Sequence, residues 1–268
     1  EHAMTCNRDG GDGKECRRLT HRNGVTPLAV GLKTPPSVKF HQLDAAPPLP
    51  FSLLLYIPAR WSPALYRLLQ PAYDPFAHLV SREARRRAVA ALDPPADAVV
   101  LVAGCGTGLS LPLLAEVLHR GWIEAIDAAP AMLGQARRRA DACRSAETGI
   151  GVRLENIKQL PYPDDTFDAI LSAYVLDLLP PPERRRACRV LARVARPGGR
   201  LITVTPAVPR RPGDHILPYL ARLFPPLLGG GRPVDLRPLL RETGWRIAVS
   251  ERSRNAGLAS QIITAHRP

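Results

Sequence analysis

The chain has 268 residues, a formal net charge of +13 and 45% hydrophobic residues. This length and hydrophobic content suit one large domain with a sizeable core and extensions. The charge would favour a polyanion partner if it were concentrated, but arginine triplets recur at residues 85–87, 137–139 and 184–186, on three separate expected helices. No basic stretch rich in aromatic residues accompanies them, so the composition argues against nucleic-acid binding.

The chain carries five cysteines and no C-x-x-C pair, so no zinc site is expected and no metal is assigned. The odd number of cysteines argues against a disulfide framework and favours a reducing, cytoplasmic location. The apolar run at residues 51–57 is far too short for a membrane span, and no signal-peptide pattern is visible.

Three segments with different patterns follow one another along the chain. Residues 1–50 mix Gly, Pro, Asp, Lys and Arg without periodicity, and we expect a disordered leader or an extension. A helical cap is expected at residues 51–83, and an amphipathic helix at 84–92 opens the main domain, residues 84–268. Three aromatic residues are interpreted as the core of the cap or as an apolar patch for a lipid-like substrate or a membrane: Trp61, Tyr66 and Phe76.

The domain is organised around the stretch from Val99 to Gly108, where an uninterrupted apolar run leads into three glycines at alternate positions. Such a run predicts a strand buried on both faces. Apolar residues at helical spacing follow, with Pro112 in the first turn of the expected helix. Strand, glycine turn and helix favour a nucleotide-like cofactor, because glycines admit a ligand close to the backbone and a helix presents free N–H groups at its start.

The spacing of the glycines discriminates between cofactors. A dinucleotide site needs G-x-G-x-x-G, whose third glycine would fall at Leu109. The chain instead has G-x-G-x-G, formed by Gly104, Gly106 and Gly108. This pattern disfavours a nicotinamide-dependent oxidoreductase, which stays open as an alternative.

A second strand, Trp122–Asp127, ends in a carboxylate about 20 residues after the glycine turn. An open α/β sheet places an acid at this point to accept hydrogen bonds from both ribose hydroxyls of a cofactor. Pro130 then begins a helix. Asp127 is therefore the candidate ribose ligand, and the alternative is an ordinary carboxylate that caps the helix.

The rest of the chain completes a sheet of seven strands, with five more at residues 151–155, 169–176, 201–205, 244–249 and 260–265. The last two should form an antiparallel hairpin at the sheet edge, separated by a loop at residues 253–258.

A helix at residues 183–194 runs into Arg196-Pro197-Gly198-Gly199, where we expect glycine to terminate the helix and turn the chain. The Pro- and Gly-rich segment 206–232 is expected to form a lid over a substrate pocket, with two polar candidates, His215 and Tyr219.

Four segments in this order resemble the motifs of the class I S-adenosylmethionine (SAM) methyltransferases, and the resemblance covers about residues 60–268. They are the glycines at 104–108, Ile-Asp-Ala-Ala-Pro-Ala-Met-Leu at 126–133, the L-P-Y-P-D-D-T-F-D register within 156–168, and R-P-G-G at 196–199. The resemblance implies a three-layer, Rossmann-like α/β fold with a mostly parallel seven-stranded sheet and a terminal antiparallel hairpin. It also implies SAM as the cofactor.

The resemblance further implies a set of cofactor contacts. Asn156 stands where the family has an Asp that accepts from the adenine amino group, and the backbone N–H of Ile157 would donate to the ring. Tyr73 belongs to a Tyr-Asp pair similar to one found in the family's cap. The full set implied is Tyr73, Gly104, Cys105, Gly106, Thr107, Gly108, Asp127, Ala128, Met132, Asn156, Ile157 and Tyr174.

The chain departs from the family at two acidic positions, which are occupied by Val102 and Asn156. A degenerate binding module without catalysis therefore stays open as an alternative. No N-P-P-Y or D-P-P-Y sequence is present, and the candidate catalytic residues near the transfer site are Tyr174, Asp177 and His215.

The nearest relatives by resemblance are the methyltransferases of ubiquinone and menaquinone biosynthesis and the bacterial phospholipid N-methyltransferases. They imply a small, lipophilic acceptor, peripheral contact with a membrane and no metal.

Overall fold

The computed structural model describes residues 63–145, 147–210, 232–255 and 258–268, with side chains described from residue 78 onward in the first helix. All of these residues belong to one compact unit, Pro50–Pro268. Its helices are α1 (Pro63–Leu92), α2 (Leu111–Val117), α3 (Pro130–Cys143), α4 (Pro181–Val194) and α7 (Arg237–Glu242). Its strands are β1 (Val99–Ala103), β2 (Trp122–Asp127), β3 (Gly149–Leu154), β4 (Phe167–Ala173), β5 (Ala195–Pro206), β6 (Arg246–Asn255) and β7 (Leu258–His266).

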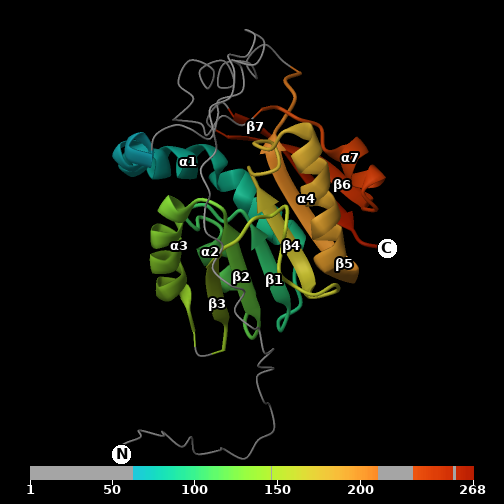
Figure 1. Cartoon of the computed structure of the whole chain (residues 1–268), viewed down its shortest axis with the longest axis horizontal. Coiled ribbons are helices and arrows are strands. Elements are labelled where there is room, and N and C mark those ends of the chain that lie inside the picture. Colours follow the sequence, from blue (N-terminus) through green and yellow to red (C-terminus); the bar gives the residue numbers. More distant parts are fainter. Residues whose placement is uncertain (1–62, 146, 211–231, 256–257) are drawn as a thin grey trace, which may run out of the picture. The chain divides into compact units, whose positions relative to one another are not determined.

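The strands form one seven-stranded sheet in the order β3-β2-β1-β4-β5-β7-β6 (Figure 1). The first five are parallel to their neighbours, whereas β7 is antiparallel to both β5 and β6. The predicted mostly parallel sheet with a terminal antiparallel hairpin is therefore confirmed. In such a sheet the carboxyl ends of β1, β2 and β4 share one edge, which is where ligands bind in open α/β folds.

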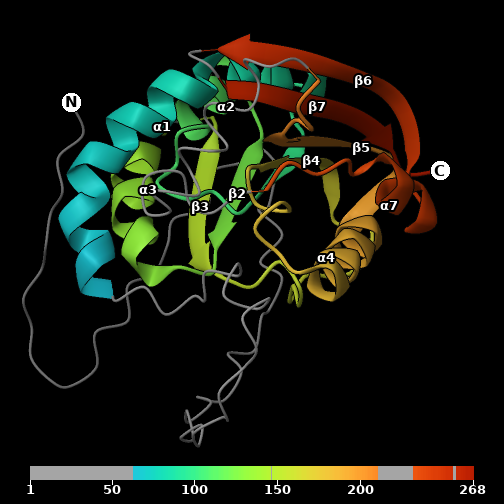
Figure 2. The ribbon, with the colours of Figure 1, turned by 90° about the horizontal axis from the view of Figure 1, so that it is seen from above.

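Helices cover both faces of the sheet, with α1, α2 and α3 on one side and α4 and α7 on the other (Figure 2). Strand β1 shows how the sequence produces this layering. Val100 and Val102 belong to the apolar core beneath the first group of helices, whereas Leu101 and Ala103 belong to the core beneath the second group. Because successive side chains of a strand point to opposite faces, a strand covered on both sides must be apolar throughout.

The first helix is longer than the sequence predicts. Helix α1 runs for 30 residues without a break, although residues 71 and 75 are prolines. The boundary expected between a cap and the main domain at residue 83 falls inside this helix. Packing of its second half against the sheet and against α2 and α3 places the helix in the same layer as those two helices.

Two expected turns are different in the structure. The helix before the R-P-G-G segment ends at Val194, and Ala195 already has an extended backbone, so glycine does not terminate it. Gly198 instead lies within β5, where its φ of +76° bends the strand and its N–H donates to the Arg267 carbonyl oxygen. The loop expected at residues 253–258 is also wrong, because β6 and β7 remain paired up to Asn255 and Leu258.

Several predictions fall outside the described residues. They include the lid for residues 211–231 with His215 and Tyr219, and the side chains of the cap aromatics and of Tyr73, which lies on the backbone of α1. None of the helices that the structure describes combines the length and the apolar composition required to cross a bilayer.

Candidate functional site

The glycine turn and Asp127 meet at the carboxyl edge of the sheet. Strands β1 and β2 pair in register up to Ala103 and Ile126, and the Ile126 carbonyl oxygen accepts hydrogen bonds from the N–H groups of Gly104 (2.9 Å) and Cys105 (2.7 Å). The Gly106 N–H then donates to Oδ2 of Asp127 at 2.7 Å. The turn and the carboxylate are thus fixed to each other by backbone hydrogen bonds.

Asp127 also fixes the residue that precedes the next helix. Its Oδ1 accepts a hydrogen bond from the N–H of Ala129 at 2.8 Å, and Ala129 is the residue that precedes α3. Both oxygens of the carboxylate are thereby held in place, yet each retains further acceptor capacity. The bond goes to the residue before α3 and not to the N–H groups of its first turn, so the carboxylate is not an N-cap. It can still accept ribose hydroxyls.

The glycine turn provides space for a ligand at one position and none at another. A Cβ atom on Gly104 would lie 2.3 Å from Cγ2 of Val175, and the residue has a φ of +78°. A Cβ atom on Gly106, at φ +56°, would meet nothing within 4 Å. The turn therefore packs closely on its β4 side and is open above Gly106, which fits a group lying across it.

The other three residues of the turn, Cys105, Thr107 and Gly108, are buried. Thr107 accepts a hydrogen bond at its carbonyl oxygen from the Arg139 guanidinium of α3. Burial, reinforced by the Asp127 carboxylate, raises the pKa of the Cys105 thiol to about 12. The thiol is therefore neutral near pH 7, which excludes it as a nucleophile. Val102, which stands where the family has an acid, is buried in the core.

The segment after β3 lies against the end of β2. The N–H of Glu155 donates to the Asp127 carbonyl oxygen at 3.1 Å, which brings Asn156 and Ile157 to the same edge of the sheet. Asn156 is exposed, and its Oδ1 accepts a hydrogen bond from the N–H of Lys158 at 3.0 Å. Ile157 is buried in the core. An amide oxygen has two lone pairs, so Asn156 can accept a second donor.

The predicted contacts Ala128, just before α3, and Met132, in its first turn, have different environments. Ala128 is exposed, whereas Met132 is buried and its N–H donates to the Ala129 carbonyl oxygen.

Tyr174 follows β4 directly and adopts a φ of +60°, which is uncommon for a residue with a side chain. Its hydroxyl lies 2.7 Å from Oγ of Ser260 on β7, and the Arg85 guanidinium of α1 lies 5.4 Å from its ring centroid. Burial raises the pKa of Tyr174 to about 12, against the lowering effects of Ser260 and Arg85. The phenol is therefore a neutral hydrogen-bonding group near pH 7 and not a base.

Asp177 is buried three residues further on. Its Oδ1 has no hydrogen-bond partner within the described part of the chain. Burial raises the pKa of this carboxyl to about 7, although a backbone hydrogen bond and Arg184 oppose the shift. A carboxyl that titrates near neutrality can exchange a proton with a substrate, provided that the substrate reaches it.

Two residues that the sequence did not single out contact Tyr174 at this edge, and a third is a buried carboxylate in the middle of β2. Arg85 and Ser260 contact Tyr174 from α1 and β7, and Glu124 is a buried carboxylate on β2. In the sequence, Arg85 was noted only as part of an arginine triplet. No sequence pattern indicated a role for Ser260 or Glu124. Among the described residues, no group of three or more His, Cys, Asp or Glu side chains is placed to hold a metal ion.

Fold and site together define an α/β protein that binds a nucleoside-type cofactor at the carboxyl edge of its sheet. Comparison with known proteins gives the family. The sequence family described as "Methyltransferase domain" matches residues 100–199.

Among curated proteins, a phosphatidylethanolamine N-methyltransferase of Cereibacter sphaeroides is 35% identical over 132 residues, which cover 49% of this chain and 62% of that protein. A demethylmenaquinone methyltransferase of Thermus thermophilus is 32% identical over 174 residues, 62% of this chain and 76% of that protein. Among solved structures, the N-methyltransferase NodS of Bradyrhizobium japonicum, in complex with S-adenosyl-L-homocysteine, has a TM-score of 0.56 at 19% identity. That likeness covers 76% of this chain and 98% of NodS, and it shows the fold.

The chain belongs to the class I SAM-dependent methyltransferases, with SAM as the cofactor. Family membership decides against the nicotinamide-dependent oxidoreductase.

Proposed function

We propose that this chain transfers the methyl group of SAM to a small, lipophilic acceptor of the quinone or phospholipid kind. The proposal rests on the contact between the glycine turn and the Asp127 carboxylate. The Gly106 N–H donates to Asp127 at 2.7 Å, and a Cβ atom on Gly106 would meet nothing within 4 Å, which leaves room for a ligand. The names of two relatives, which act on phosphatidylethanolamine and demethylmenaquinone, support the lipophilic class of acceptor.

The proposed cofactor contacts divide by the part of the ligand that they recognise. Asp127 would accept hydrogen bonds from the ribose hydroxyls, since its position is fixed by two backbone donors. Asn156 would accept from the adenine amino group, and the N–H of Ile157 would donate to the ring. The backbone of residues 104–108 would lie under the ligand, with Ala128, Met132, Tyr73 and Tyr174 completing the set.

When bound, SAM supplies an activated methyl group on a sulfonium, so the protein must mainly position the acceptor in line and exclude water. Tyr174 suits the positioning role because its hydroxyl is fixed by Ser260 and its ring by Arg85. Asp177 is the candidate proton acceptor for an acceptor atom that loses a proton. We retain His215 as a further candidate.

A lipophilic acceptor implies peripheral contact with a membrane surface, and this contact is part of the proposal. We also propose a cytoplasmic location, which the free thiols of Cys105, Cys143 and Cys188 support.

Calorimetric titration with SAM and S-adenosyl-L-homocysteine tests the cofactor site. The expected Kd is micromolar, which corresponds to roughly 8 kcal/mol. Asp127→Ala should lose about 1.5–3 kcal/mol for each hydrogen bond to the carboxylate. Because this variant also removes two backbone contacts, Asp127→Asn, which keeps an acceptor oxygen, is measured beside it. Asp97→Asn, on an exposed residue, is the control.

The absence of binding by the wild type at millimolar ligand would favour the degenerate module and contradict the enzymatic proposal. The acceptor is tested by incubation with SAM labelled in its methyl group, in the presence of phosphatidylethanolamine vesicles or a demethylated quinone. Label in the lipid or the quinone is expected. Label that enters only water-soluble acceptors would contradict the lipophilic class.

A further inference from the structure

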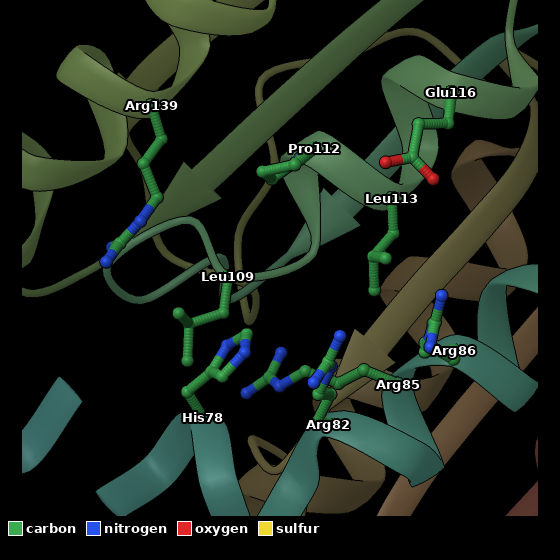
Figure 3. Close-up of a pocket in the computed structure, with 9 residues that line it drawn as sticks. All are labelled: His78, Arg82, Arg85, Arg86, Leu109, Pro112, Leu113, Glu116 and Arg139. Atoms are coloured by element: carbon green, nitrogen blue, oxygen red, sulfur yellow. The ribbon is translucent and has the colours of Figure 1, made fainter. Parts of the chain in front are cut away.

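A basic hollow of about 470 Å³ lies where α1 passes α2 and α3 (Figure 3). A volume of this size is within the range of small-molecule sites. None of its lining residues belongs to the proposed set of SAM contacts, but the hollow adjoins that set, since Arg139 donates to the Thr107 carbonyl oxygen and Arg85 lies against the ring of Tyr174. The lining residues are His78, Arg82, Arg85, Arg86, Leu109, Pro112, Leu113, Glu116 and Arg139.

The hollow receives its charge mainly from one stripe of α1. His78, Arg82, Arg85 and Arg86 are spaced by four, three and one residues, which places them on the same side of the helix. In Figure 3 their side chains rise from α1 toward the start of α2. Arg139 adds a fourth guanidinium from α3.

Little negative charge balances these arginines. Glu116 is the single carboxylate among the lining residues. Glu83, in the same turns of α1, pairs instead with Arg87 at 2.7 Å. Within the described part of the chain, Arg82 and Arg86 form no hydrogen bond or ion pair. Like charges four residues apart destabilise a helix, so their placement has a cost that a bound anion would offset.

The inner part of the hollow is preorganised. The Arg85 guanidinium donates to Oγ of Ser81 and to Oγ of Ser110, each at 2.9 Å, and both serines are buried. Arg139 is fixed by its bond to the Thr107 carbonyl oxygen. Arg82 and Arg86 are exposed at the mouth. Because the guanidinium groups of Arg85 and Arg139 are already held in place, binding an anion there costs less conformational entropy.

We propose that this hollow binds a phosphoryl anion. Guanidinium groups match the oxygens of a phosphate in geometry and charge, and four of them line this hollow. The apolar side chains of Leu109, Pro112 and Leu113 suit a short carbon chain attached to the phosphate. A soluble phosphate ester and the headgroup of an anionic lipid present this same chemistry.

Binding assays with two probes test the proposal: glycerol 3-phosphate in titration, and vesicles of phosphatidylcholine with or without phosphatidylglycerol in sedimentation. The test variant is Arg82→Ser/Arg86→Ser. The matched control is Arg137→Ser/Arg138→Ser, which removes the same charge from exposed positions of α3 outside the hollow. The test variant should weaken binding by about tenfold or more, whereas the control should retain wild-type binding.

The two probes distinguish the sources of the phosphate. Binding of glycerol 3-phosphate that depends on Arg82 and Arg86 supports a soluble ester, and binding only to vesicles with phosphatidylglycerol supports a lipid headgroup. The proposal is overturned if neither probe binds, if both variants lose binding equally, or if only an RNA duplex binds through these residues. Titration of the same variants with SAM should give an unchanged Kd. A failure of the phosphoryl-binding proposal can therefore be distinguished from a failure of the methyltransferase proposal.

Discussion

At Gly104 the backbone conformation and a neighbouring side chain both exclude any other residue. The φ of +78° is strained for an L residue, and a Cβ atom would lie 2.3 Å from Val175. Val175 follows β4, so this contact fixes the distance between the glycine turn and the segment that carries Tyr174. The glycine therefore determines how closely two parts of the candidate site approach each other.

We predict that Gly104→Ala lowers the free energy of unfolding by about 1–3 kcal/mol or more, because strain and overlap add. Gly134→Ala is the matched control, since it lies on α3 with nothing within 4 Å and should raise stability by about 0.5–1 kcal/mol. Urea denaturation measures both. Equal effects of the two substitutions would show that the close approach to Val175 does not matter.

Asp177 should make stability depend on pH in an unusual direction. Burial raises its folded-state pKa to about 7, whereas the unfolded chain loses this proton near pH 4. The native state therefore binds more protons than the unfolded state between these values, so the free energy of unfolding should fall as pH rises from about 4 to about 7.

Asp177→Asn should remove this contribution and raise stability at pH 8 by about 2–4 kcal/mol relative to wild type, with little effect at pH 4. Denaturant unfolding at both pH values measures the difference. Asp97→Asn, at an exposed position, is the control and should leave the pH dependence as in the wild type. If Asp177→Asn raised the free energy of unfolding by the same amount at pH 4, the titration of Asp177 could not be the cause of the effect.

At the scale of elements, a buried network joins β2, β3 and the segment before β4. Oε1 of Glu124 accepts from the Tyr162 hydroxyl at 2.9 Å and pairs with Nε of Arg153 at 2.6 Å, and Oε2 accepts from Nε1 of Trp122 at 2.8 Å. Glu124 is buried, whereas the Arg153 side chain is 50% exposed. The network fastens the edge of the sheet that precedes Asn156.

Within this network the phenol should matter more than the ion pair. Tyr162→Phe should cost about 1.5–3 kcal/mol, because it removes a hydrogen bond to a buried charge. Arg153→Met keeps most of the stem and should cost less than Tyr162→Phe, because the Arg153 guanidinium is half exposed and water screens its attraction to Glu124 on that side. Thermal unfolding of the two variants tests the order, and a larger loss for Arg153→Met would reverse this account.

The elements that the sequence predicts best are those defined by local pattern. Trp122–Asp127 and the end of α4 at Val194 have the expected bounds, and the strand before the glycine turn is buried on both faces. Prediction failed where tertiary contacts outweigh local signals. Helix α1 continues through two prolines, and β5 includes the R-P-G-G segment, which lies between the pairing of Ala195 with Phe167 and the pairing of Arg200 with Ala169 and His266.

At the scale of the whole molecule, the arrangement of charge differs from what the arginine triplets suggested. Residues 85–87 do not form one solvated face, since Arg85 contacts Tyr174 and two buried serines while Arg87 pairs with Glu83. Arg85 thus connects the basic hollow with the residue at the end of β4. The three arginines of this one triplet therefore lie in three different environments.

The sequence by itself predicted the fold class and the order of strand, glycine turn and helix, because these elements are contiguous and their pattern is set by local backbone geometry. Its resemblance to the methyltransferases gave SAM as the cofactor, and the role of Asp127 stays a prediction. Only the tertiary structure brought Arg85, Tyr174 and Ser260 together, and only it placed Arg139 of α3 in the lining of the same hollow as the arginines of α1. These residues are distant in sequence and lie on different elements. Their proximity depends on the angles at which helices pack on the sheet, which no local pattern encodes.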